Sequence, residues 1–80
     1  MQILIQIDTP DFDAWKTAWD DDYEDRMQAG LSQMQIWRDA DKGSTVLVLL
    51  DANDRKKAEA WLSKERGFGG AMTATFLRTA

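Results

Sequence analysis

Three short stretches of the chain alternate hydrophobic and polar residues, a fourth is almost continuously apolar, and two longer ones repeat apolar residues every three or four positions. Alternation is typical of strands that bury one face, and the longer repeat is typical of amphipathic helices. The strand patterns cover residues 1–7, 31–38, 45–50 and 71–78, and the helical patterns cover 12–29 and 54–66. The predicted order is strand, helix, strand, strand, helix, strand.

The first predicted helix carries an aromatic stripe. Asp11 is placed to cap its N-terminus, and Gly30 is placed to end it because glycine readily adopts the left-handed conformation found after helix C-termini. Residues at spacings of three and four share one face, namely Phe12, Trp15, Trp19, Tyr23 and Met27. We therefore expect one long amphipathic helix before Gly30.

The middle of the chain predicts a hairpin. Its first strand would place Met34 and Ile36 on the face opposite Gln33, Gln35 and Trp37, and residues 39–43 have the composition of a turn.

A second helix and a last strand follow. Asn53 or Asp54 can cap this helix, and the glycine-rich residues 67–70 would end it. The expected inward residues of the helix are Ala58, Trp61 and Leu62, and the strand alternates Met72, Ala74 and Phe76 against Thr73, Thr75 and Leu77.

This order of elements is that of the ferredoxin-like βαββαβ fold, an α+β domain with a four-stranded antiparallel sheet and two helices on one face. Residues 1–80 would form one such domain. The helices leave the other sheet face open, where Leu4, Trp37 and Leu47 would make an exposed apolar patch. We expect a second copy of the chain to cover that patch, which predicts a homodimer.

Composition excludes several classes of function. The 80 residues include 14 acidic and 10 basic side chains, giving a net charge of −4, and there is no Cys and no His. Thiolate nucleophiles, Cys-built zinc sites and imidazole chemistry are therefore absent. The acidic balance argues against nucleic-acid binding, and no apolar run approaches the roughly 20 residues of a membrane helix. With no secretory signal pattern either, we expect a cytoplasmic protein without a cofactor or a membrane partner.

Several short motifs resemble a known superfamily. They are the stretch at residues 11–16 (DFDAWK), Trp19 with Asp20, Ala29 with Gly30, residues 37–41 (WRDAD), residues 58–61 (AEAW) and residues 75–77 (TFL). Together these segments resemble the dimeric α+β barrel superfamily, especially its antibiotic biosynthesis monooxygenase-like and uncharacterised cyclase-like members. The motifs are structural in character and point to a fold more than to a reaction.

The resemblance implies a homodimer whose sheets pack face to face, with a cavity between the helices and the sheet of each subunit. The haem-degrading branch and the cyclases with His acid/base pairs are excluded because this chain has no His. Cofactor-independent monooxygenases, which use Trp, Tyr, Arg and Asn, stay open, although the one Asn here is Asn53 in a predicted helix cap.

The aromatic stripe has two interpretations. It packs a thin core, or it lines a pocket for a compact hydrophobic or aromatic metabolite, and a helix-to-sheet space of at least roughly 300 Å³ would favour the pocket. Whether the chain is an enzyme stays open, and the alternative is a non-enzymatic assembly or regulatory module. The candidate ligand-binding residues are Trp15, Trp19, Tyr23, Arg26, Trp61 and Phe76.

The acidic cluster at residues 20–25 does not predict a metal site. Consecutive carboxylates on a helix point in different directions, and the Gly-containing calcium loop is missing. Lys16 with Asp20 and Asp22 with Arg26 are spaced as i,i+4 ion pairs, which predicts a solvated charged face.

Overall fold

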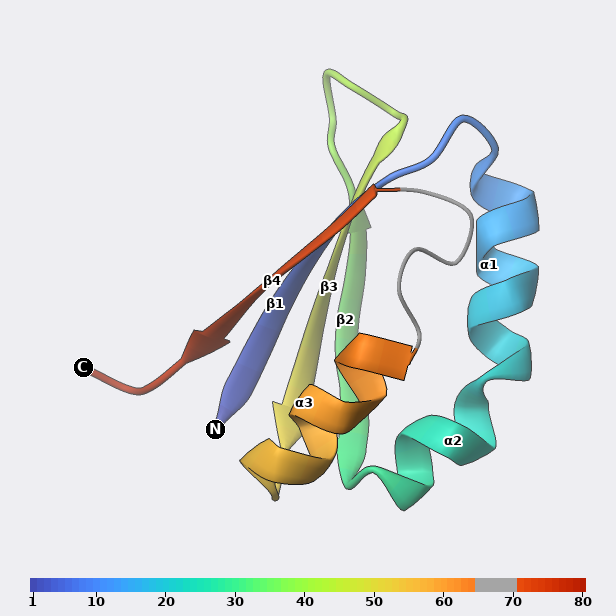
Figure 1. Ribbon diagram of the computed structural model, residues 1–80. Helices are drawn as coiled ribbons and strands as arrows, with labels where there is room; N and C mark the ends of the chain where they lie inside the picture. The colour runs from blue at the N-terminus through green and yellow to red at the C-terminus, as the bar shows by residue number, and fades with distance from the viewer. Residues whose placement is uncertain (65–70) are drawn as a thin grey trace.

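Four strands and three helices form the described part of the chain, which is residues 1–64 and 71–80 of the computed structural model (Figure 1). The helices lie on one side of the sheet and leave the other side open. In chain order the elements are β1 (Gln2–Asp8), α1 (Phe12–Asp21), α2 (Tyr23–Gln28), β2 (Leu31–Arg38), β3 (Thr45–Ala52), α3 (Arg55–Lys64) and β4 (Ala71–Leu77).

The sheet has the order β2-β3-β1-β4, and every neighbouring pair of strands is antiparallel. This is the ferredoxin-like arrangement that the sequence predicts, with β1 and β3 in the centre. Ile5 lies opposite Val48 on β3 and opposite Ala74 on β4, so the apolar side chains of three strands meet on the face that the helices cover. The predicted glycine-rich turn at 67–70 and the predicted helix end near residue 66 lie outside the described residues.

The prediction of one long helix before Gly30 is wrong, because the helix breaks at Asp22 into α1 and α2. The Asp22 backbone N–H donates to the carbonyls of Trp19 and Asp20 at the end of α1, and its own carbonyl accepts the first bond of α2 from Arg26. The break changes which residues face the sheet. Tyr23, expected on the buried stripe, is 58% exposed, whereas Arg26 is buried.

The predicted faces of β2 are also partly wrong, because a β-bulge lies between Gln33 and Gln35. The extra residue reverses the alternation, as bulges do. Gln33 therefore shares the helix-covered face with Ile36, whereas Met34 lies with Trp37 on the open face.

Local caps and turns follow the sequence prediction. Asp11 accepts from the Ala14 N–H at 3.0 Å, and Asp54 rather than Asn53 caps α3 by accepting from the Lys57 N–H at 3.2 Å. Gly30 has a φ of +73°, and a β-carbon there would come within 2.0 Å of the side chain of Asn53, so only glycine fits this turn.

Asp39 stabilises the turn between β2 and β3. Its carboxylate accepts from the backbone N–H groups of Asp41 at 2.8 Å and Lys42 at 3.0 Å. These two hydrogen bonds, with a smaller contribution from the Lys42 charge, lower the pKa of the Asp39 carboxyl below its ordinary value. The Asp39 side chain is exposed and both of its hydrogen-bond partners lie in the same turn, so it is a structural feature of the hairpin.

The open face of the sheet is apolar in its centre, as the sequence predicts. Leu4 pairs with Leu49 across β1 and β3, and Trp37 pairs with Leu47 across β2 and β3. The three leucines are half-buried and Trp37 is 44% exposed in the single chain. We call Leu4, Trp37, Leu47 and Leu49 the open-face patch.

Candidate functional site

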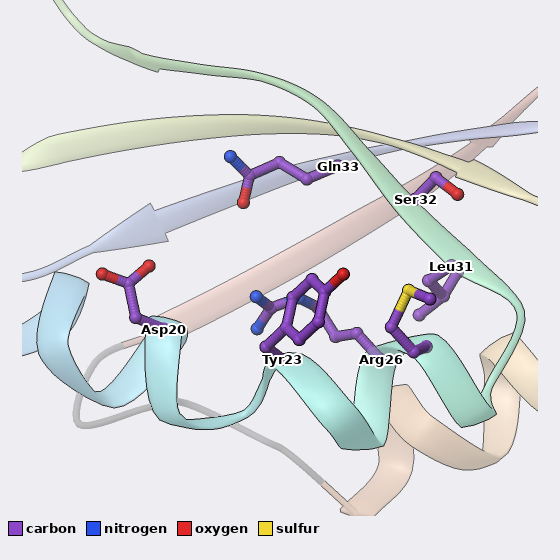
Figure 2. Close-up of a pocket in the computed structure, with 7 residues that line it drawn as sticks. Asp20, Tyr23, Arg26, Leu31, Ser32 and Gln33 are labelled. Carbon is purple, nitrogen blue, oxygen red and sulfur yellow. The ribbon is translucent and has the colours of Figure 1, made fainter.

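A groove of about 550 Å³ opens between the helix side of the molecule and the edge strand β2. Figure 2 shows Tyr23 and Arg26 on its helix side and the strand β2, which carries Gln33, on its other side. The groove lies where the helix breaks at Asp22 and α2 continues in a new direction beside β2. Its lining residues are Asp20, Tyr23, Arg26, Met27, Leu31, Ser32 and Gln33.

Arg26 is the cation of this groove, and its side chain is only 5% exposed. Its Nη1 donates to the backbone carbonyl of Trp19 and lies 3.4 Å from the Asp22 carboxylate. The guanidinium also stacks 4.0 Å from the centre of the Trp19 ring. A buried charge is tolerated only when it is paired and hydrogen-bonded, and these contacts meet both conditions.

Two buried tryptophans donate hydrogen bonds to polar side chains in or next to the groove. Trp61 donates its indole N–H to the Asp22 carboxylate at 2.9 Å, which ties α3 to the break between α1 and α2. Trp19 donates its indole N–H to Gln33 at 2.8 Å, which ties α1 to the inward-facing residue of the β2 bulge. Buried polar networks that are satisfied in this way stiffen the surrounding structure.

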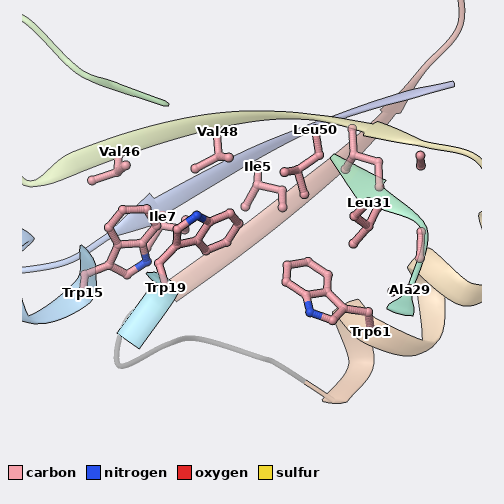
Figure 3. Packing of buried hydrophobic residues seen from close by; sticks show 13 residues of the cluster. Ile5, Ile7, Trp15, Trp19, Ala29, Leu31, Val46, Val48, Leu50 and Trp61 are labelled. Carbon is pink, nitrogen blue, oxygen red and sulfur yellow. The ribbon is translucent and has the colours of Figure 1, made fainter. Parts of the chain in front are cut away.

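The six residues proposed from the sequence as ligand-binding lie in three places. Tyr23 and Arg26 line the groove. Trp15, Trp19 and Trp61 are buried in the hydrophobic core below it (Figure 3). Phe76 lies on β4, partly buried, with the Arg55 guanidinium 4.3 Å from its ring centre.

The tryptophan rings pack against one another. Trp15 stacks on Trp19 with ring centres 5.3 Å apart, and Trp19 meets Trp61 edge-on at 6.0 Å. Both geometries are favourable for aromatic pairs. The helix-to-sheet interior beneath α1 is therefore occupied by side chains, and the groove lies to one side of it.

Sequence reasoning did not find five of the lining residues. Asp20 was assigned to a solvated face and Met27 to the buried stripe, because the break at Asp22 leaves no trace in the hydrophobic spacing. Ser32 and Gln33 had one available signal, since they are two consecutive polar residues that interrupt the alternation of the strand between Leu31 and Met34. The remaining residue, Leu31, gave no signal of its own.

Other chemistry in the described residues is limited. No three acidic side chains within residues 1–64 and 71–80 are grouped to hold a metal ion. In the same residues the buried indole N–H of Trp15 has no hydrogen-bond partner. None of the helices that the structure describes has the length and apolar content to cross a membrane. The i,i+4 pairs Lys16–Asp20 and Asp22–Arg26 both form, but the second is buried and not solvated.

Comparison with known proteins supports the fold. No protein-family model and no curated protein matches the chain. Among solved structures, it is similar to a candidate antibiotic biosynthesis monooxygenase from Nitrosomonas europaea. The two share 15% sequence identity with a TM-score of 0.52, over 99% of this chain and 98% of the other. The resemblance noted in the sequence is therefore confirmed as a shared fold, whereas a reaction has to be argued from the groove itself.

Proposed function

We propose that the chain binds a compact aromatic metabolite in the groove between α2 and β2. The observation that supports this proposal most directly is a space of about 550 Å³ beside a buried, fixed arginine. Small-molecule sites in proteins span about 300 to 1,000 Å³ and combine apolar walls with a few placed polar groups. The groove meets both criteria.

The lining suggests how such a ligand would lie. The exposed ring of Tyr23 and the side chains of Met27 and Leu31 offer apolar contact for a flat molecule. Gln33, on the opposite wall, offers an amide for hydrogen bonds to ring oxygens. Of the residues proposed from the sequence, Tyr23 and Arg26 contact the ligand, and the tryptophans support them from the core.

The reaction we propose for the bound ligand is oxygenation or cyclisation without a cofactor. Oxygenation is the activity in the description of the structural neighbour. Cyclisation is what the resemblance of the sequence motifs to cyclase-like proteins implies. The two reactions are distinguished by measuring oxygen uptake after a phenol that binds the protein is added, because only oxygenation consumes dioxygen.

Ligand binding can be tested by fluorescence. Naphthoquinone, juglone and naphthol are titrated into a Trp37→Phe background, which removes the tryptophan on the opposite sheet face and leaves three beside or beneath the groove. We expect saturable quenching, and we expect Tyr23→Ala to weaken binding about tenfold because it removes the aromatic contact. Tyr23→Phe is the matched control and retains most of the affinity. Absence of saturable quenching by every compound would overturn the proposal.

We also propose that two copies of the chain pair through the open-face patch. Central leucines on β1 and β3, with Trp37 beside them, form one continuous apolar surface on the face without helices. Monomeric proteins seldom leave such patches in water. A two-fold dimer would place the same patch of each copy against the other.

Replacing Leu47 with glutamate is expected to dissociate the dimer. The substitution buries two carboxylates without partners, one from each copy, so the dimer dissociation constant should rise at least about a hundredfold. Sedimentation equilibrium measures the change. Ala18→Glu is the matched control, because it adds the same charge at an exposed position on α1. A wild-type chain that stays monomeric at micromolar concentration would contradict the pairing.

A non-enzymatic assembly module is the second candidate function. The close packing of Trp15, Trp19 and Trp61 favours it, because the space beneath α1 serves the core and not a ligand. This candidate predicts a stable dimer that binds none of the compounds named above.

A further inference from the structure

We infer that the groove selects uncharged ligands and rejects anions such as carboxylates, sulfonates and phosphates. This inference rests on the proposed function and specifies the substrate class of the same site. A buried arginine in a pocket usually suggests an anion site, but the contacts of Arg26 point the other way.

The positive charge of Arg26 is already compensated within the protein. The Asp22 carboxylate lies 3.4 Å from its Nη1, and both side chains are more than nine-tenths buried. The carbonyl of Trp19 and the face of the Trp19 ring add further negative potential around the same guanidinium. Trp61 keeps the Asp22 carboxylate in position by a 2.9 Å hydrogen bond, so the pair is fixed.

The rim of the groove is acidic. Asp20 is the other charged lining residue, and its partner Lys16 bonds it at 2.7 Å on the exposed surface. Asp21 and Glu24 are exposed on either side of the break. Residues 20–26 together hold five carboxylates and one guanidinium. Lys64 pairs with Asp25 at 3.4 Å, so the segment together with this lysine and Lys16 keeps a net charge of −2. An approaching anion therefore meets a repulsive potential.

The remaining polar groups of the groove are neutral. The hydroxyl of Tyr23 and the amide of Gln33 can bond phenol, ketone or quinone oxygens without any charge on the ligand. An anion in the groove would lose its hydration and gain no uncompensated cation in return, which is unfavourable. Uncharged aromatic alcohols and carbonyl compounds are the class that fits.

A matched pair of ligands tests this selectivity. Naphthol and naphthoate, substituted at the same ring position, have nearly the same shape, but at neutral pH only naphthoate is charged. Binding is followed through the indole and amide N–H NMR signals of the wild-type protein, with Trp19 and Gln33 as reporters of the groove. We expect naphthol to bind at least about fivefold more tightly than naphthoate, and the difference to shrink as salt is added.

Charge-removing variants provide a sharper test. Asp22→Asn keeps the shape of the side chain and an oxygen acceptor for Trp61, but it removes the negative charge that compensates Arg26. Naphthoate affinity should therefore rise, while naphthol affinity changes little. Because Asp22→Asn also weakens the folded state, Asp20→Asn makes the same test at an exposed rim position and should raise naphthoate affinity about twofold. Asp13→Asn is the control, since it makes the same change in net charge on α1 away from the lining residues.

The outcomes separate this inference from the proposed function. Naphthoate binding as tightly as naphthol, or Asp20→Asn and Asp13→Asn having equal effects, would overturn the charge selectivity while leaving a ligand site in place. If neither compound shifts the groove signals, both the ligand site and its selectivity are wrong.

Discussion

Replacing Trp19 with alanine is expected to lower the free energy of unfolding by about 3–5 kcal/mol, the range measured for large aromatic residues removed from protein cores. Trp19 is fully buried, stacks on Trp15 and meets Trp61 edge-on. Its indole N–H also donates to Gln33 at 2.8 Å, and the Arg26 guanidinium stacks on its ring. Alanine would leave a cavity and would remove both polar contacts at once.

Urea denaturation at fixed protein concentration measures this loss, because a dimer's stability depends on concentration. Tyr23→Ala is the matched control: it removes an aromatic ring four residues away that is 58% exposed. We expect that control to change stability by less than about 1 kcal/mol. If the two variants lose similar stability, Trp19 does not occupy the centre of the core as the structure has it.

The fold could be predicted from the sequence because its signals are local. Alternation placed Ile3, Ile5 and Ile7 on one face of β1, and all three are fully buried. The apolar run at residues 46–50 is typical of a strand that is covered on both faces, and β3 lies in the interior of the sheet between β1 and β2. Period-two and period-3.6 patterns report burial directly, so they survive without knowledge of the partner elements.

The groove could not be predicted in the same way, because it depends on where regular patterns stop. The spacing from Trp19 to Tyr23 to Met27 continues the helical repeat. The helix is nevertheless interrupted at Asp22, and Tyr23 and Met27 point outward. A tertiary contact is made by the residue at the break. Asp22 is held by Trp61 from a helix 39 residues away, and no local pattern reports such a bond.

The pair Asp22–Arg26 shows the same limit. Its i,i+4 spacing predicted an ion pair correctly. The predicted pair was solvated, whereas the observed pair is buried and fixed beneath the groove. Exposed pairs of this kind contribute little to stability. Removing one partner of a buried pair leaves the other charge buried and uncompensated, which is strongly destabilising. Spacing identifies partners, and only the three-dimensional structure shows how much water surrounds them.

Breaking that pair is therefore expected to have the second large effect on stability. Arg26→Met and Asp22→Leu should each lower the free energy of unfolding by about 3–5 kcal/mol, because each leaves the other charge buried without its partner. The double variant replaces both charges with apolar side chains of similar size. It should lie within about 2 kcal/mol of the wild-type protein and above either single variant.

A double-mutant cycle in urea makes this comparison quantitative. The coupling energy is expected to be large because the two side chains touch and are both more than nine-tenths buried. Lys16→Met, Asp20→Leu and their double variant form the control cycle at an exposed i,i+4 pair of shorter distance, 2.7 Å, where coupling should stay below about 1 kcal/mol. Additive losses in the Asp22–Arg26 cycle would mean that water reaches this pair. The groove would then rest on an arginine whose charge is screened by solvent and not fixed by Asp22 and Trp61.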